Sequence, residues 1–247
     1  MTAKFYLVGG AVRDRLMGLR TKDLDFAVSI EPEGRDIDQL YRAMRDELDW
    51  RGFEIHTETP DKFVIRARVC KTDLLYKVAR DADFVLCRKD GPYTDGRRPD
   101  WVEPGTLFDD LARRDFTVNA MAEHPFTHKI IDPFGGQRDL ENKILRFVGN
   151  PEERIIEDGL RVVRGFRFMI SKGLTADPLT WSFLNSDIAA KALSIISIER
   201  VDQEISRMFQ ADTKASIHLM ASITPNVLGQ IFRDRLHLTG SLKNVKE

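Results

Sequence analysis

The fold is decided by two short runs near the amino terminus, which read LVGGAVRD at residues 7–14 and KDLDFAV at residues 22–28. An apolar segment leads into Gly9 and Gly10, where the backbone can turn sharply and a ligand can approach closely. Residues 11–17 are amphipathic and are followed by another glycine, the pattern of a short helix with a glycine at its end. The second run is strand-like. We therefore expect a strand, a tight turn, a short helix and a second strand, in this order.

The same runs carry a candidate binding site for a polyphosphate and a metal ion. Backbone amides at a helix start attract anions, and Arg13 adds a positive charge one turn into the predicted helix. Asp23 and Asp25 lie two residues apart in the second strand, so their side chains project from the same side. Two adjacent carboxylates repel each other unless a cation joins them, and Mg²⁺ prefers oxygen ligands. The pattern therefore predicts a nucleoside triphosphate held by its phosphates above a metal-binding carboxylate pair.

Each fragment alone is a common local pattern, since two glycines before a helix are often only a turn. The joint order of glycines, helix and Asp-X-Asp on a strand is far more specific. It resembles the nucleotidyltransferase superfamily to which DNA polymerase beta belongs, and in particular the bacterial-type tRNA CCA-adding enzymes and poly(A) polymerases. The resemblance implies that Asp23 and Asp25 hold two Mg²⁺ ions. It also implies that Gly9, Gly10 and Arg13 cradle the phosphates of CTP or ATP.

Composition sets the outer bounds. The 247 residues are 42% hydrophobic and 31% charged, as in ordinary soluble globular proteins. No apolar run approaches the ~20 residues of a membrane span, and no signal peptide is recognisable, so we expect a cytoplasmic protein without a membrane partner. Cys70 and Cys87 lie far from any histidine cluster and are predicted to be buried thiols. A net charge of −1 does not itself indicate a nucleic-acid binder, so the 38 Lys and Arg residues would have to gather on one face.

The next segment carries a helix, three strands and a loop. Apolar residues recur at helical spacing over residues 37–48, and strands are predicted near residues 53–56, 63–69 and 83–88. The string KDGPYTDGRRPD at residues 89–100 is rich in turn residues and predicts a mobile loop.

The family resemblance extends to this segment. It places a third carboxylate at Asp83 and implies that the loop over residues 89–100 adjusts the site between CTP and ATP. The connection between residues 70 and 81 departs from the family pattern, because it is longer and more helical than the tight hairpin we would expect.

The string RRDFTVNAM at residues 113–121 is helix-compatible, and salt bridging is its simplest interpretation. It also resembles the most specific motif of the family. The resemblance implies that Arg114, Asp115 and Asn119 contact the ribose hydroxyls and phosphates of the nucleotide. Their chemistry agrees, because a carboxylate and an amide can together accept from and donate to a 2′-hydroxyl.

A capped helix is predicted over residues 151–168, and it contains the string EDGLR. Asp158 and Arg161 would lie on one face of it, and the simplest interpretation is an intrahelical ion pair. The string is similar to the template motif of the family, which implies that these two side chains recognise the base. A carboxylate accepts from the exocyclic amine of cytosine or adenine and a guanidinium donates to the ring nitrogen, whereas uracil and guanine would leave both unpaired. Arg164 and Arg167 continue the basic series and are assigned to nucleotide binding.

The remaining segments set the predicted domains. We expect an α+β fold with a small mixed-sheet nucleotidyltransferase head over residues 1–125. A helical neck that recognises the base follows over residues 126–210, with its last family-like motif at residues 197–205. Residues 211–247 are expected to form a short helical body remnant. The resemblance thus lacks most of the helical body and tail that grips the elbow of tRNA in family members.

The resemblance implies a metal-dependent enzyme that adds C and A residues from CTP and ATP to the acceptor 3′ end of tRNA and releases pyrophosphate. The alternatives within this class are poly(A) addition and A-only or CC-only addition. The retained loop at residues 90–100 disfavours CC-only addition, which in the family accompanies a lost loop element. The alternative of another class is a non-catalytic nucleotide- or RNA-binding protein, against which the intact carboxylates argue. The sequence leaves the oligomeric state open.

Overall fold

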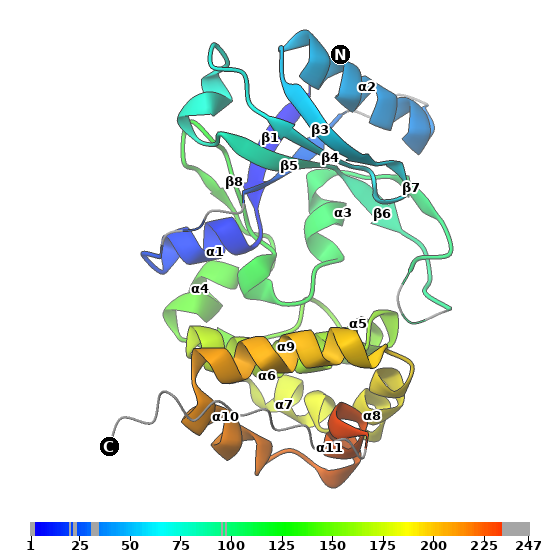
Figure 1. Ribbon diagram of the computed structural model, residues 1–247, viewed down its shortest axis with the longest axis vertical. Helices are drawn as coiled ribbons and strands as arrows, with labels where there is room; N and C mark the ends of the chain where they lie inside the picture. Colours follow the sequence, from blue (N-terminus) through cyan, green and yellow to red (C-terminus); the bar gives the residue numbers. More distant parts are fainter. Residues whose placement is uncertain are drawn as a thin grey trace.

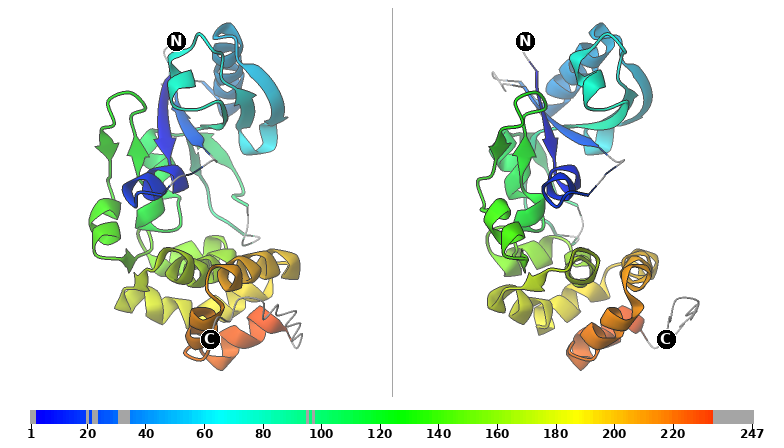
Figure 2. Two further views of the ribbon diagram at one scale, coloured as in Figure 1. Left: turned by 60° about the vertical axis from the view of Figure 1, so that its left-hand side comes forward. Right: turned by 90° about the vertical axis from the view of Figure 1, so that its left-hand side faces the viewer.

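A computed structural model of the protein describes residues 3–19, 21, 24–30, 35–94, 96 and 98–233 (Figure 1). A sheet-containing part and an all-helical part lie one above the other, and the views in Figure 2 agree on this arrangement. The predicted α+β class, with a small mixed sheet followed by helices, is confirmed.

Seven strands of the described chain form one mixed sheet in the order β3-β4-β5-β2-β1-β8-β9. β2 and β5 run parallel, and the other neighbouring pairs in this sheet are antiparallel. The strands are β1 (Lys4–Val8), β2 (Asp25–Ser29), β3 (Glu54–Thr59), β4 (Val64–Arg68), β5 (Asp81–Leu86), β8 (Ala122–Glu123) and β9 (Ile130–Ile131).

The long helix α2 (Ile37–Trp50) covers one face of the sheet. Asp36 caps it by accepting a hydrogen bond from the amide of Gln39 at 2.7 Å. Its apolar side packs with the inward side chains of β2, β4 and β5 into one core. The short helix α3 (Leu107–Ala112) packs on the other face, where a smaller cluster includes Val8, Ala27 and Leu111. The rest of this second face, across β5 and β4, carries charged side chains.

The smaller elements of the sheet-containing part connect and extend the sheet. They are α1 (Gly10–Leu16), α4 (Gly136–Glu141), the antiparallel hairpin of β6 (Arg88–Asp90) and β7 (Val102–Pro104), and the 3₁₀ turns Pro60–Lys62, Leu74–Lys77 and Thr117–Asn119. The loop predicted over residues 89–100 begins in β6 and continues into the tip of this hairpin, with residues 95 and 97 outside the described residues. The hairpin lies on the side of the sheet that faces the helices (Figures 1 and 2).

The helical part is built on one apolar cluster that runs from Phe116 to Ile231. α6 and α9 pack side by side in it (Figure 1). The helices are α5 (Pro151–Glu157), α6 (Leu160–Lys172), α7 (Pro178–Leu184), α8 (Asp187–Ser194), α9 (Ile198–Ala211), α10 (Thr213–Met220) and α11 (Pro225–Phe232), and the short parallel pair β10 (Ile144–Leu145) and β11 (Thr175–Ala176) lies beside them. Within the described ranges, no helix combines the length and apolar character needed to cross a membrane.

The single helix predicted over residues 151–168 is wrong, because the chain breaks between α5 and α6. Asp158 is extended, with φ −150° and ψ 103°, and ends α5. A side chain at Gly159 would place its Cβ 2.3 Å from the carbonyl oxygen of Ala192, so the backbone approaches α8 as closely as only glycine permits. Asp158 is therefore a junction residue and not a mid-helix one.

Two other predictions are settled by the fold. The long connection between residues 70 and 81 contains the 3₁₀ turn Leu74–Lys77, yet β4 and β5 still pair as antiparallel neighbours. Of the two cysteines predicted to be buried, Cys87 is buried and burial raises its pKa, whereas Cys70 is partly exposed and that prediction is wrong.

Candidate functional site

Two aspartates stand side by side on the sheet face opposite α2. The parallel register of β2 and β5 places Asp25 directly opposite Asp83. Because side chains alternate along a strand, Phe26 and Phe84 point into the core, where their rings stack with centroids 5.5 Å apart. Asp25 and Asp83 therefore point to the other face, and both are partly accessible. Asp23, the remaining predicted carboxylate, lies outside the described residues.

The donor chemistry of this pair fits a hard divalent cation. Both side chains offer carboxylate oxygens, the ligands that Mg²⁺ prefers. Two carboxylates on neighbouring strands repel each other, and a bound cation would offset this repulsion. In the part of the chain that the structure describes, no group of three or more His, Cys, Asp or Glu side chains could hold a metal ion. A metal at Asp25 and Asp83 would take its other ligands from water or from substrate phosphates, and Asp23 is a further candidate from sequence.

The glycine turn ends β1 and lies against an arginine of residues 113–116, called the RRDF motif below. Gly9 has φ 68° and ψ −131°, and its amide donates to the carbonyl oxygen of Met121 at 3.3 Å. A Cβ at Gly9 would lie 2.6 Å from Nη1 of Arg114. The turn therefore needs glycine both for its backbone angles and for the approach of Arg114.

A chain of polar contacts joins α1 to α6 through the RRDF motif. Arg13, only 5% exposed, donates to the side-chain oxygen of Asn119 and, at 2.8 Å, to Asp14. Asn119 Nδ2 donates to Asp115 Oδ1 at 2.9 Å, and Arg164 Nε donates to Asp115 Oδ2 at 2.9 Å. The structure thus brings four predicted nucleotide-binding residues into one network.

Asp115 is ionised in this network. Burial alone would raise the pKa of its carboxyl, but the Arg164 guanidinium and the Asn119 amide outweigh burial and hold this pKa well below its usual range. The Asp115 charge in turn raises the pKa of Arg164.

A second buried carboxylate organises the two adjacent arginines. Asp110, fully buried on α3, accepts from Arg113 at 2.5 Å and from Arg114 at 3.0 Å. Burial opposes its ionisation, yet these two guanidiniums hold the pKa of Asp110 below its usual value. Arg114 also donates to the carbonyl oxygen of Asn119 at 3.4 Å, while its buried Nε has no partner among the described residues.

Three guanidiniums surround one aromatic ring at the centre of α6. Arg13, Arg164 and Arg167 lie 5.1, 5.5 and 4.0 Å from the centroid of Phe168. Arg167 is also paired with Glu204 of α9. Cation–π attraction thus helps to hold these three guanidiniums together, and a carboxylate pairs with each of them. Phe168 was not predicted as a site residue, although its place four residues after Arg164 on one helix was a usable signal.

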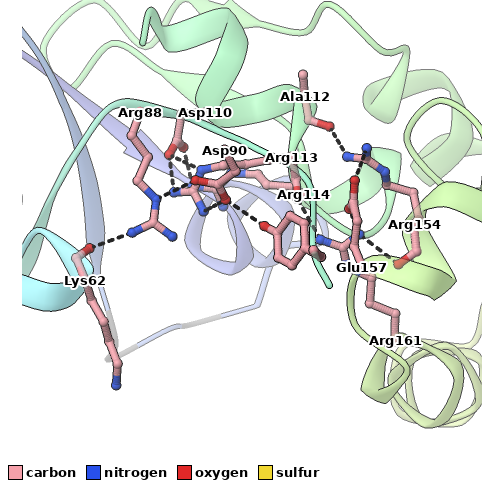
Figure 3. Close-up of polar contacts among 11 residues, drawn as sticks. Lys62, Arg88, Asp90, Asp110, Ala112, Arg113, Arg114, Arg154, Glu157 and Arg161 are labelled. Carbon is pink, nitrogen blue, oxygen red and sulfur yellow. Dashed lines mark hydrogen bonds and ion pairs between the residues drawn. The ribbon is translucent and has the colours of Figure 1, made fainter. Parts of the chain in front are cut away.

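Asp158 and Arg161 lie close in sequence but contact different partners. Asp158 accepts from the amide of Leu160 at 3.1 Å and pairs with Arg200 of α9 at 3.3 Å. The simplest interpretation of the sequence, an intrahelical pair of Asp158 with Arg161, is therefore wrong. Arg161 pairs instead with Glu157 at 2.6 Å, as Figure 3 shows.

Backbone carbonyls hold Arg161 as well. Its guanidinium donates to the carbonyl oxygen of Arg154 at 2.9 Å and to that of Arg113 at 2.8 Å (Figure 3). Arg161 is thereby fixed between α5 and the end of α3, so the helical part and the RRDF motif meet at this side chain.

The root of the β6–β7 hairpin joins the same region. Asp90 accepts from Arg88 at 2.8 Å, and Arg113 lies 3.8 Å away (Figure 3). The Tyr93 hydroxyl also donates to Asp90, at 2.7 Å. Burial and the Asp90 carboxylate raise the pKa of Tyr93. Asp90, Asp110 and Glu157 were not predicted as organising carboxylates. Their spacing from nearby arginines was a usable signal, but the partners that other elements contribute could not be predicted from sequence.

Comparison with known proteins identifies the family. A family model described as the poly A polymerase head domain matches residues 5–146. The CCA-adding enzyme of Staphylococcus saprophyticus subsp. saprophyticus is 33% identical over 208 residues, which are 84% of this chain and 46% of the relative. The CCA-adding enzyme of Lacticaseibacillus paracasei is 38% identical over 205 residues, 82% of this chain and 45% of the relative. The chain thus spans about half the length of the curated relatives it matches.

Solved structures show the same likeness. The chain is similar to the Bacillus stearothermophilus CCA-adding enzyme in complex with CTP, with a TM-score of 0.66 and 28% identity over 90% of this chain and 48% of that one. It is also similar to a tRNA nucleotidyltransferase complexed with a primer tRNA and an incoming ATP analog, with a TM-score of 0.68 and 26% identity over 93% of this chain and 59% of that one. Since the family model covers more than half of the chain, this chain belongs to the poly A polymerase head domain family.

Proposed function

We propose that this chain is a nucleotidyltransferase that adds C and A residues from CTP and ATP to the 3′ end of tRNA and releases pyrophosphate. The observation that carries the proposal is the register of β2 and β5, which sets Asp25 beside Asp83 on an accessible face. Relatives named CCA-adding enzymes and solved complexes with CTP, primer tRNA and an ATP analog support the choice of substrates. Since these substrates are intracellular, we also propose a cytoplasmic location.

The carboxylates of the sheet are assigned to metal binding and to the primer. Asp23 and Asp25 would hold Mg²⁺, and Asp83 would complete the site beside the primer 3′-hydroxyl. When bound, Mg²⁺ would lower the pKa of that hydroxyl and offset the charge of the leaving pyrophosphate. Asp25 and Asp83 contribute by fixing where the hydroxyl lies, because both project from neighbouring strands in register.

The triphosphate is assigned to the turn at Gly9 and Gly10, with Arg13 and Arg114 behind it. Glycine at position 9 keeps the backbone open to a ligand, and the buried Arg114 Nε is a donor that still lacks an acceptor among the described residues. Arg164 and Arg167 are also assigned to the nucleotide, although Asp115 and Glu204 pair with them. The Arg114 Nε would therefore be the first donor available to a phosphate oxygen.

The ribose is assigned to Asn119 more than to Asp115. Both oxygens of Asp115 already accept, from the Phe116 amide, Asn119 and Arg164. Asn119 uses one amide hydrogen and one lone pair in the network, so one of each remains for a hydroxyl. Asp115 would then orient Asn119 and Arg164.

Base choice is assigned to Asp158 and Arg161. Arg161 uses three of its five N–H groups on Glu157 and on two backbone carbonyls, so two donors remain for a base. Asp158 accepts one hydrogen bond at each oxygen and keeps acceptor capacity. Asp158 and Arg161 could therefore bind the edge of cytosine or adenine and keep the hydrogen bonds described above.

The division into a head over residues 1–125, a neck over residues 126–210 and a body part from residue 211 also belongs to this proposal. Two apolar clusters, one in the sheet and one in the helices, support a division of this kind. The sheet continues past residue 125 to β9, however, and Phe116 already packs with the helices.

One assay tests the function and separates its alternatives. The protein is given tRNA that lacks its terminal CCA, labelled CTP, ATP and Mg²⁺, and the products are sized. Three added residues support CCA addition, a long ladder indicates poly(A) addition, and one or two residues indicate a CC-only or A-only enzyme. Binding of tRNA and nucleotide without any extension would overturn the enzymatic proposal in favour of a binding protein.

A further inference from the structure

The carboxylate row of the sheet continues into an arginine on the next strand. Asp25 of β2 lies opposite Asp83 of β5, and Asp83 lies opposite Arg66 of β4. The flanking residues Ile65 and Ala67 are buried on the α2 side, so Arg66 shares the face of the two aspartates. Its side chain is 56% exposed. Arg66 was not among the predicted site residues, and it has no role in the site described above.

The strand order puts Arg66 on the far side of the carboxylates from the phosphate site. β1 and β5 flank β2 on opposite sides, with the Gly9 turn at the end of β1. In phosphoryl-type transfer the attacking and leaving oxygens lie roughly in line. If pyrophosphate leaves on the β1 side, the primer hydroxyl must enter on the β5 side, and β4 is the next strand there. A cation on this face of β4 thus meets the primer and not the triphosphate.

The charge balance singles out Arg66 over its neighbour Arg68. Arg68 is matched by two carboxylates, Asp81 at 3.3 Å and Glu54 at 3.4 Å. Arg66 lies 3.5 Å from Asp83, a long contact between exposed groups that contributes little stability. Because a guanidinium has five donors in a planar fork suited to phosphate, it can take a phosphodiester and keep its carboxylate contact.

We propose that Arg66 binds the last phosphodiester of the primer RNA and thereby sets its terminal 3′-hydroxyl against Asp83. This inference rests on the proposed nucleotidyltransferase function and names the residue through which that site holds its acceptor strand.

The first test compares Arg66→Gln with Arg45→Gln. Arg45 is a matched control: it is 46% exposed and paired with Glu58 at 3.1 Å, but it lies on α2, which covers the opposite face of the sheet. We expect Arg66→Gln to raise the KM for tRNA lacking its CCA by roughly five- to tenfold. The KM for CTP should stay within about twofold, and Arg45→Gln should change neither. Equal rises in both KM values would overturn the proposal, because Arg66 would then act on the carboxylate site.

The second test uses direct binding, so that it does not depend on turnover. The probe is a 5′-labelled RNA hairpin with an acceptor-like 3′ end, either unmodified or with a neutral methylphosphonate in place of its last phosphodiester. Arg66→Gln should weaken binding of the unmodified hairpin and leave that of the neutral hairpin unchanged, since the two changes remove the same contact. An equal loss with both hairpins, or none with either, would refute the role of Arg66. If Arg66→Gln weakened only the unmodified hairpin, as expected, but the wild type added no nucleotide, the proposed reaction would be refuted and the RNA contact of Arg66 would stand.

Discussion

The carboxylates of the sheet differ in burial and pairing from Asp110 and Asp115, which lie at and next to the RRDF motif. Asp110 and Asp115 are buried, and each is matched by guanidiniums that hold its pKa down. Asp83, in contrast, is partly exposed and meets Arg66 at 3.5 Å. Buried pairs with several short contacts are fixed parts of the scaffold, whereas accessible carboxylates in register can accept a ligand. The same residue type therefore serves structure in one region and, in the proposed function, chemistry in the other.

The largest effect is expected for Asp25→Ala, which tests whether the accessible carboxylates carry the chemistry. The change removes one accessible carboxylate, so we expect nucleotide incorporation to fall by at least about a thousandfold. The fold should persist, with thermal unfolding close to that of the wild type, because Asp25 is at the edge of the core. Extension of CCA-less tRNA with labelled CTP measures the first effect, and circular dichroism measures the second. Appreciable remaining activity would show that the metal assignment is wrong.

Asp110→Ala should do the reverse and damage the fold. It would leave Arg113 and Arg114 without their shared buried partner, which costs about 3 kcal/mol in the free energy of unfolding. Urea unfolding followed by fluorescence measures this loss. The control is Asp46→Ala on the exposed side of α2, which should change stability by less than about 0.5 kcal/mol. An Asp110→Ala protein as stable as the control would contradict the scaffold role.

Arg161→Ala tests whether a group embedded in the scaffold can also read a base. We expect discrimination between CTP and UTP to fall by roughly ten- to a hundredfold, with a smaller loss of turnover. The measurement is kcat/KM for each nucleotide, with the exposed Arg207→Ala as control. If turnover fell while discrimination stayed intact, Arg161 would be a structural residue only.

The smallest expected effect is on acid stability. The pKa of Asp115 is lower in the folded than in the unfolded chain, where it is about 3.9. Its stabilisation is thus complete above pH ~4 and is lost as pH falls toward the folded pKa. Between pH 5 and pH 3 the wild type should lose about 1–2 kcal/mol more stability than Asp115→Asn. Parallel pH dependences in urea unfolding would contradict this assignment.

Sequence patterns predicted the elements that depend on local periodicity. The turn at Gly9, α2 and the strand carrying Asp83 follow from period and glycine chemistry, and the pairing of Asp83 with Asp25 follows from the family resemblance. The break at Gly159 could not be predicted, because it results from contact with Ala192 on another helix. The partner of Arg161 was equally ambiguous, because Asp158 and Glu157 precede it by three and four residues and both have helical spacing. In the structure Arg161 pairs with Glu157.

The shared apolar cluster of the helices bears on how the molecule can be divided. Val227 and Ile231 of α11 pack into the same core as Val162 and Val163 of α6. The terminal described helices and the helix that begins beside Asp158 should therefore open and close as one cooperative unit. A protein shortened after residue 210 would lose part of this core. If such a protein no longer selected the correct base, the cause would be unfolding of the remaining helices, not the loss of a separate RNA-binding segment.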